Sequence, residues 1–129
     1  MTRRGLLLFA HGARDARWAL PFEDVVARVR AAAPAVAVEL AYLEFMQPGL
    51  LEAGARLAAG GCTQVDVVPL FLGAGGHVRK DVPDFFARLQ RAHTGVTWRL
   101  QPAIGEVEAV LQAMADAALA GLAARDGAQ

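Results

Sequence analysis

The amino-acid sequence predicts an α/β protein with a four-stranded parallel sheet and helices on both faces. Four short apolar runs alternate along the chain with four segments in which apolar residues recur at helical spacing. Such alternation is typical of strands joined by crossover helices, which make a parallel sheet. The runs are apolar on both faces, as expected for strands that helices cover from each side.

The strands are expected at residues 6–10, 36–43, 65–72 and 96–100. A first helix follows the first strand, because apolar residues recur there with a period near 3.6, and Pro34 closes it. Its apolar positions are Trp18, Phe22, Val25, Val26 and Val29. A second helix is expected to begin near Pro48, which suits a first helical turn, and to end at Gly60 and Gly61.

The third helix is expected to begin at Asp81 and Pro83, after a glycine-rich loop. The last helix is expected over about residues 106–124, with apolar side chains on one face. That face holds Val107, Val110, Leu111, Met114 and Leu122. We interpret residues 1–129 as a single domain whose residues 125–129 form a frayed tail.

Composition narrows the classes of function. Hydrophobic residues make up 55% of the chain and charged residues 20%, which excludes a disordered segment. Thirteen basic and 13 acidic residues give no net charge, which argues against a nucleic-acid or membrane-surface binder. A single cysteine, Cys62, and the absence of a long apolar run lead us to expect a cytoplasmic protein without a membrane span.

Three polar side chains follow the first three strands. His11, Glu44 and His77 each stand 33 residues after the previous one, as expected from successive strand–helix units of similar length. The carboxyl ends of parallel strands meet at one edge, so all three side chains can converge if the first strand is central. Two imidazoles and a carboxylate suit a divalent first-row metal and leave coordination positions open. Taken singly, each is also explained as a hydrogen-bonded structural histidine or a solvated loop carboxylate.

The same edge of the sheet is locally basic and glycine-rich. Four cations follow the two histidines: Arg14, Arg17, Arg79 and Lys80. Cations are unfavourable at helix starts, so their clustering indicates an anionic ligand, although solvated charges are the ordinary alternative. The glycines at positions 73, 75 and 76 do not match a phosphate-binding motif, but glycine lets a backbone approach a flat, bulky ligand closely. The chain lacks serine, which excludes ordinary serine hydrolases.

Three segments resemble the small sirohydrochlorin chelatases, which belong to the class II chelatases of cobalamin and sirohaem biosynthesis. They are LLLFAHGARD at residues 6–15, YLEFMQP at residues 42–48 and VPLFLGAGGHVRKDVP at residues 68–83. The resemblance extends over about residues 5–115, and the glycine–histidine segment is its most specific part. Ala13 stands where the family usually has serine, and the last helix, from Ile104, matches only loosely.

The resemblance implies a flavodoxin-like, three-layer fold and a homodimer. It also implies insertion of Co²⁺ or Fe²⁺ into a sirohydrochlorin-type tetrapyrrole without ATP and without a permanently bound cofactor. His11, His77 and Glu44 then handle the metal and the protons of the reaction. The carboxylates and ring of the tetrapyrrole are expected to contact Arg14, Gly75, Gly76, Arg79 and Lys80. Two alternatives stay open, a non-catalytic metal or tetrapyrrole carrier and a phosphate-binding module that uses the glycine loop.

Overall fold

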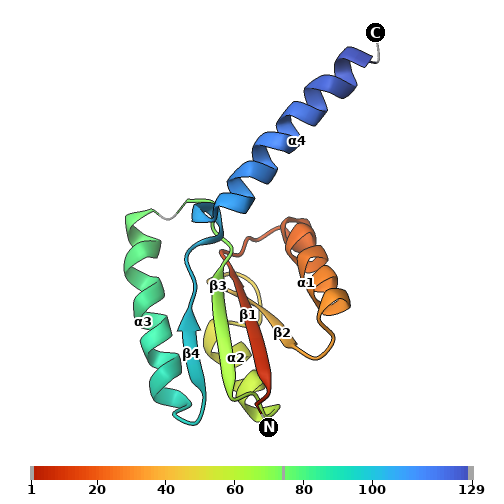
Figure 1. Cartoon of the computed structure of the whole chain (residues 1–129). Helices are drawn as coiled ribbons and strands as arrows, with labels where there is room; N and C mark the ends of the chain where they lie inside the picture. The colour runs from red at the N-terminus through yellow and green to blue at the C-terminus, as the bar shows by residue number, and fades with distance from the viewer. Residues whose placement is uncertain (1, 74, 128–129) are drawn as a thin grey trace.

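The sheet has four parallel strands, as predicted (Figure 1). A computed structural model describes residues 2–73 and 75–127, and for residues 76, 77, 126 and 127 it describes the backbone alone. The strands are β1 (Arg4–Ala10), β2 (Ala37–Tyr42), β3 (Gln64–Pro69) and β4 (Thr97–Leu100). Their order is β2-β1-β3-β4, so β1 lies between β2 and β3 as the expected convergence of strand ends requires.

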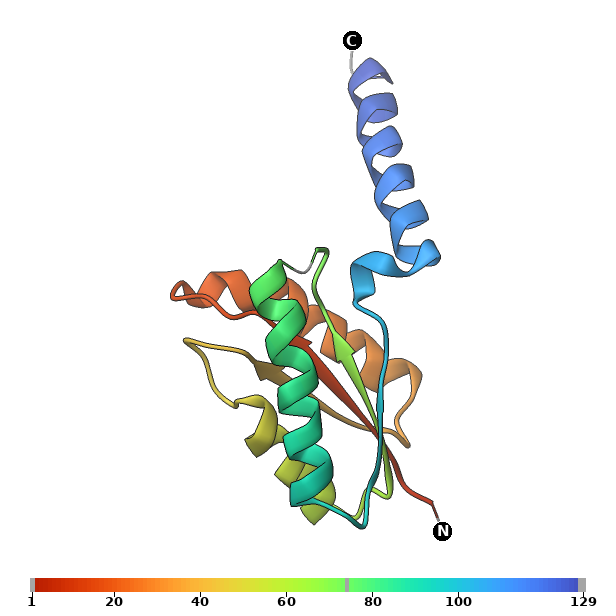
Figure 2. The ribbon, with the colours of Figure 1, turned by 90° about the vertical axis from the view of Figure 1, so that its left-hand side faces the viewer.

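Helices lie on both faces of the sheet (Figures 1 and 2). The 3₁₀ helix η1 (Ala16–Ala19) leads into α1 (Leu20–Ala32), which packs on one face. Two helices, α2 (Leu50–Ala59) and α3 (Gly76–Ala92), cover the other face. The 3₁₀ helix η2 (Ile104–Glu106) precedes the last helix, α4 (Glu108–Gly127).

The main core lies between the sheet and the pair α2 and α3. Alternate residues of the strands, such as Leu7, Phe9 and Val65, are fully buried there against Leu57 and Leu89. Alternation follows from the strand period of two, which sends successive side chains to opposite faces. Complete burial of several large apolar side chains makes this side the principal source of folding stability.

The opposite face is covered in part. Leu8, Val38 and Val68 pack against Val26 of α1 in a smaller cluster. Over β3 and β4 the same face is polar, with Asp66, Thr97, Arg99 and Gln101 as its surface residues. The Gln101 amide nitrogen donates a 2.6 Å hydrogen bond to the Asp66 carboxylate. Helices lie on both faces as predicted, but the apolar pattern expected on both faces of the strands does not extend over this half of one face.

Several predicted boundaries differ from the structure, most of all at the ends of the loops beside the carboxyl edge. Helix α3 begins at Gly76, five residues before the predicted start, because the extended Gly75 forms its N-cap and the Arg79 N–H bonds the Gly75 carbonyl at 3.0 Å. Pro83 consequently lies inside the helix. Pro48 lies in a loop, after a cis peptide bond, and α2 begins at Leu50 behind Gly49. Strand β3 ends at Pro69, so residues 70–72 belong to the following loop.

Helix α4 projects away from the rest of the chain in both views (Figures 1 and 2). The predicted apolar face does not pack on the sheet, and Leu111, Met114 and Leu122 are exposed. Of the apolar positions on α1, Val25 is likewise 40% exposed rather than part of the core. The helix continues to Gly127, where an irregular tail was expected from residue 125. Among the described residues, no helix combines the length and the apolar character that a membrane span needs.

Candidate active site at the carboxyl edge

Strand pairing brings His11 and Glu44 together. Strands β1 and β2 run in register to the pair Ala10 and Tyr42, the last residue of each strand. Beyond that pair two backbone bonds continue the ladder, from the Leu43 N–H to the Ala10 carbonyl (3.0 Å) and from the Glu44 N–H to the His11 carbonyl (3.1 Å). The His11 Nε2 atom consequently lies 3.1 Å from the Glu44 Oε1 atom. Convergence of these two predicted groups is confirmed.

Gly12 permits this close approach of the two loops. Its backbone has φ +97°, in the region that side-chain-bearing residues rarely adopt. A Cβ atom at this position would overlap the carbonyl oxygen of Glu44. Gly12 is not among the site residues that the sequence predicts, because a glycine after a strand is ordinary in a turn until its neighbour across the sheet is known.

Phe45 occupies a tight turn with an unfavourable backbone. The Met46 N–H donates to the Glu44 carbonyl at 2.8 Å, which makes a three-residue γ-turn around Phe45, whose φ is +67°. A positive φ at a bulky residue is strained and persists only where the surroundings enforce it. The phenyl ring is 58% exposed, and the Arg14 guanidinium lies over it, 4.9 Å from the ring centre. An exposed aromatic face therefore stands beside the His11–Glu44 pair.

The pair is accessible as well as preorganised. The side chain of His11 is 46% exposed and that of Glu44 is 49% exposed. The ring of Phe71, from the loop after β3, meets the His11 ring edge-on with centres 6.2 Å apart. A neutral imidazole nitrogen and a carboxylate oxygen are both ligands for divalent first-row metals, and the imidazole also accepts protons near neutral pH.

His77 cannot be placed relative to this pair, because its side chain lies outside the described residues, as does that of Gly76. The backbone of both residues is in the first turn of α3, which follows the loop after the neighbouring strand β3. Among the side chains that the structure describes, no group of three or more His, Cys, Asp or Glu residues could hold a metal ion. The convergence of His77 with His11 and Glu44 stays a prediction.

Comparison with known proteins identifies the family. The family model for CbiX matches residues 5–119 of the chain. The chain belongs to the CbiX family. A solved CbiX protein of Marinobacter aquaeolei VT8, described as a protein of cobalamin (vitamin B12) biosynthesis, is 39% identical, with a TM-score of 0.80 over 92% of this chain and 97% of that one.

Curated relatives of this CbiX chain carry the name sirohydrochlorin cobaltochelatase. The proteins from Sulfurisphaera tokodaii and Saccharolobus solfataricus are each 33% identical over 82 residues. The aligned segment covers 61% of this chain and 64% and 60% of those proteins, less than two-thirds of their length.

A longer protein shares the fold. The sirohydrochlorin chelatase SirB from Bacillus subtilis subspecies spizizenii, solved in complex with cobalt, is 24% identical, with a TM-score of 0.73. The match covers 84% of the CbiX chain but only 46% of that protein. At this identity the likeness shows the fold alone.

The predicted basic groups of the CbiX chain differ in their surroundings. Arg17 is already paired with Asp15, since its Nη2 atom lies 3.2 Å from the Asp15 Oδ2 atom. Hydrogen bonds that the side chain and the backbone of Arg17 donate to the Asp15 carboxyl lower the pKa of that carboxyl. Arg14 stacks on Phe45. Arg79 and Lys80 are exposed in the first five residues of α3. Of the four predicted cations, Arg17 is therefore the least available to an anionic ligand.

In the predicted glycine loop, the structure describes the surroundings of Gly73 and Gly75. A Cβ atom on Gly73 or Gly75 would meet no atom of the described residues within 4 Å. Gly75 has φ −66° and ψ +166°, a conformation that any residue adopts. Neither the backbone conformation nor a close contact with the part of the chain that the structure describes therefore requires glycine at position 75.

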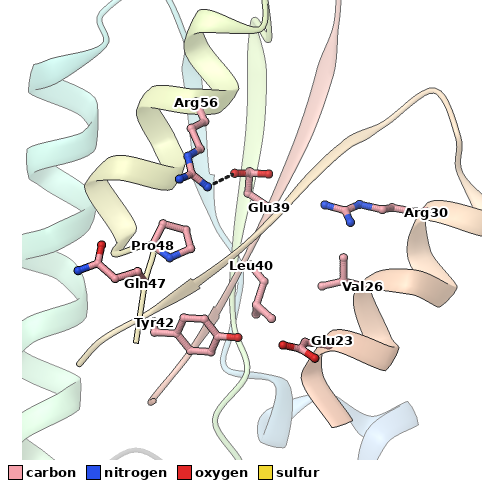
Figure 3. Close-up of a pocket in the computed structure, with 9 residues that line it drawn as sticks. All are labelled: Glu23, Val26, Arg30, Glu39, Leu40, Tyr42, Gln47, Pro48 and Arg56. Atoms are coloured by element: carbon pink, nitrogen blue, oxygen red, sulfur yellow. Dashed lines mark hydrogen bonds and ion pairs between the residues drawn. The ribbon is translucent and has the colours of Figure 1, made fainter. Parts of the chain in front are cut away.

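A separate hollow lies against the outer edge of β2 (Figure 3). Its cations are engaged, since Arg56 pairs with Glu39 and Glu52, and Arg30 donates to the Val38 carbonyl. The Tyr42 hydroxyl points toward Glu23 in Figure 3, and burial, with the Glu23 charge second, raises the pKa of that phenol. This hollow holds neither His11 nor Glu44, so it is a different feature from the carboxyl-edge site.

Proposed function

We propose that the chain is a metal chelatase that inserts Co²⁺ or Fe²⁺ into a sirohydrochlorin-type tetrapyrrole without ATP. One observation carries the proposal, the His11–Glu44 pair held 3.1 Å apart and half-exposed at the carboxyl edge. The names of the curated relatives support the same substrate and reaction class. In open parallel sheets this edge is also where ligands ordinarily bind.

The pair suits the two requirements of metallation. The incoming M²⁺ ion must exchange water for other ligands, and two N–H protons must leave the ring as two metal–nitrogen bonds replace them. His11 Nε2 and Glu44 Oε1 can hold the ion transiently, since two protein ligands leave most coordination positions open. As the ion passes to the ring, the same atoms become free to accept the released protons.

His77 is proposed as the third member of this group. It follows β3 in the same way that His11 follows β1 and Glu44 follows β2, with equal spacing along the chain. Since β3 pairs with β1, the first turn of α3 begins at the same edge as His11. A second imidazole there would complete a donor set typical of first-row metals.

The tetrapyrrole is proposed to lie against the loop after β3 and the Phe45 ring. Gly75 and Gly76 would allow a flat ring to approach the backbone closely, while Arg14, Arg79 and Lys80 would pair with its carboxylates. Replacing Arg79 and Lys80 by alanine should therefore weaken tetrapyrrole binding, measured by absorbance titration. Arg28→Ala on α1, where Arg28 pairs only with Asp24 among the described contacts, is the matched control and should leave binding unchanged.

The reaction needs the reduced metal and a reducing setting. Cys62 is a free, buried thiol, as expected for a chain in a reducing compartment, and we propose the cytoplasm. Such a compartment also keeps iron in the Fe²⁺ form. Imidazole and carboxylate accept both Co²⁺ and Fe²⁺, so metal supply is proposed to decide which ion is inserted.

The working unit is proposed to be a homodimer. The half-exposed His11–Glu44 pair lies on an open edge of the sheet, which encloses a large flat tetrapyrrole poorly. The same edge of a second copy, facing the first, would exclude water from the tetrapyrrole ring. Related SirB proteins with the same fold are about twice as long, since the match covers 44% and 46% of their chains. A second copy of this chain would supply a comparable length of protein.

The proposed activity is tested by an anaerobic assay with sirohydrochlorin and Co²⁺ or Fe²⁺, followed by the change in tetrapyrrole absorption. The wild type should metallate the ring faster than a protein-free control, and His11→Ala should lose at least about 100-fold of that rate. His93→Gln is the matched control, because His93 caps the far end of α3.

The carrier alternative gives a different result in the same assay. Binding of metal and tetrapyrrole without any acceleration would mean that this edge serves a carrier.

A further inference from the structure

The imidazole of His11 has a single hydrogen-bond partner among the described residues. Its Nε2 atom lies 3.1 Å from the Glu44 Oε1 atom, and no described group forms a hydrogen bond with its Nδ1 atom. The side chain is also 46% exposed, so the core does not enclose it. The torsion that turns a histidine ring about its Cβ–Cγ bond is broad, so one contact leaves the ring free to turn. A second contact is therefore needed to keep the ring in this orientation.

Phe71 supplies a second contact, from the strand on the other side of β1. The pairing of β1 with β3 continues past the last residue of β3, because the Leu70 N–H bonds the Phe9 carbonyl at 2.7 Å. One residue further along each chain, Phe71 lies beside His11, and the two rings meet edge-on with centres 6.2 Å apart. His11 therefore lies between Glu44 on the β2 side and Phe71 on the β3 side.

The Phe71 ring is itself fixed. Phe71 is only 7% exposed, and its ring meets the fully buried Phe9 ring at an angle of 64°, with centres 5.6 Å apart. The Phe71 carbonyl accepts a 2.9 Å bond from the Gly105 N–H, which anchors the backbone of the loop at this point. The next residue, Leu72, is 67% exposed. Phe71 is therefore the last buried residue before the glycine loop, and its ring reaches from the core to the carboxyl edge.

A fixed aromatic ring can do what a second hydrogen bond does at many metal-binding histidines. Such histidines usually bond a carboxylate or a carbonyl through the ring nitrogen that does not face the metal, and this bond fixes the orientation of the ring. The residues that the structure describes offer His11 no such bond. Edge-on ring pairs at this separation are favourable and directional, so Phe71 restrains the imidazole while Glu44 holds its Nε2 atom.

We propose that Phe71 is a positioning residue that holds the His11 imidazole in its orientation toward Glu44 and thereby sets the affinity of the site for a divalent cation. Phe71 donates no ligand and acts through His11 alone. The inference rests on the proposed function in taking His11 as a metal ligand, and it holds whether the chain inserts the ion or only carries it. A phenylalanine that served the core alone would affect stability but not the affinity for metal.

The first test is a Co²⁺ titration of the metal-free protein, followed by visible absorption. Phe71→Leu keeps an apolar side chain but removes the ring, and it should raise the Kd for Co²⁺ about tenfold. Phe86→Leu is the matched control, because Phe86 packs against the same core from α3 and makes no ring contact with His11 among the described residues. It should lose a similar amount of stability and bind Co²⁺ as the wild type does. Unchanged affinity in Phe71→Leu, or equal weakening in both variants, would overturn the proposal.

Two further substitutions separate the ring of Phe71 from its apolar volume. Phe71→Tyr keeps the ring and should bind Co²⁺ within about threefold of the wild type. Phe71→Met fills the space with a flexible chain and should bind Co²⁺ about tenfold more weakly, and it replaces Phe71→Leu if that variant does not fold. Wild-type affinity in Phe71→Met would overturn the proposal, as would an affinity of Phe71→Tyr as weak as that of Phe71→Met.

Crystal structures of the metal-free wild type and of Phe71→Leu test the orientation of the ring directly. In the wild type the His11 imidazole should have one orientation, with Nε2 toward Glu44. In Phe71→Leu it should be turned away from Glu44 or occupy two orientations. A single orientation that is the same in both proteins would overturn the positioning role.

The insertion assay with sirohydrochlorin distinguishes failure of this inference from failure of the proposed function. Phe71→Leu should raise the KM for Co²⁺ about tenfold and change the KM for the tetrapyrrole by no more than about twofold. If His11→Ala binds Co²⁺ as tightly as the wild type, the proposed metal site is overturned, and the positioning role with it. If His11→Ala binds Co²⁺ more weakly but Phe71→Leu does not, the positioning role alone is overturned.

Discussion

The two halves of the carboxyl edge use glycine in opposite ways. Between the ends of β1 and β2, Gly12 has a positive φ and its Cβ position is filled by the Glu44 carbonyl. In the loop after β3, no described atom lies where a side chain on Gly73 or Gly75 would begin. The first glycine is required by packing within the chain. Packing among the described residues does not require Gly73 and Gly75, so a ligand could approach the backbone at these two positions.

The largest effect is expected at Gly12. Gly12→Ala forces a Cβ atom against the Glu44 backbone and strains a positive φ, which should lower the free energy of unfolding by about 3 kcal/mol. The metallation rate should fall about 100-fold, because the His11–Glu44 pair is displaced. Urea unfolding and the insertion assay measure the two effects. A fully stable and active variant would show that the two loops do not depend on this approach.

Phe45 tests the strain on the same half of the edge. Phe45→Gly should be about 1 kcal/mol more stable than Phe45→Ala, because glycine adopts a positive φ without strain and alanine does not. At ordinary helix or strand positions the order is reversed, since glycine is there the less stable of the two. Both variants remove the ring beneath Arg14 equally. Thermal unfolding of the pair checks the prediction. If the alanine variant is the more stable, the γ-turn is not strained.

Gly75 tests the other half. Gly75→Ala should lower the free energy of unfolding by no more than about 1 kcal/mol, the cost of alanine at an N-cap, because its backbone is ordinary and no described atom lies within 4 Å of the added Cβ. Tetrapyrrole binding should nevertheless weaken about tenfold if the ring lies against this loop. An absorbance titration measures the affinity. Unchanged affinity would remove this loop from the substrate site.

The smallest effect concerns Asp15, which caps η1 just beyond the Gly12 loop. Hydrogen bonds from Arg17 lower the pKa of Asp15 in the folded state below its ordinary value of 3.8. The carboxylate therefore contributes stability above about pH 3.8, and this contribution is lost as the pH falls through the lowered pKa. The difference in Tm between wild type and Asp15→Asn should shrink accordingly below that pH. A difference that is independent of pH would show that the charge of Asp15 plays no part.

The features of the fold that depend on local sequence pattern could be predicted from the sequence. The four parallel strands followed from the alternating apolar runs, and the meeting of His11 with Glu44 followed from their positions at strand ends once β1 proved to lie beside β2. Two features were not predictable in this way. The positive φ of Phe45 belongs to the γ-turn between Glu44 and Met46, and phenylalanine gives no sign of a positive φ. The position of α4 was missed because an apolar helix face shows that a helix will be buried but not against which surface.

A double-mutant cycle in single-turnover metallation tests whether His11 and Glu44 together drive metal insertion. Glu44→Gln should lower the rate about 100-fold, and adding His11→Ala to it should cost little more, because the two groups act as a unit. Glu52→Gln is the control, since Glu52 pairs only with Arg56 among the described contacts. Undiminished metallation by Glu44→Gln, or independent and fully additive losses, would contradict the account.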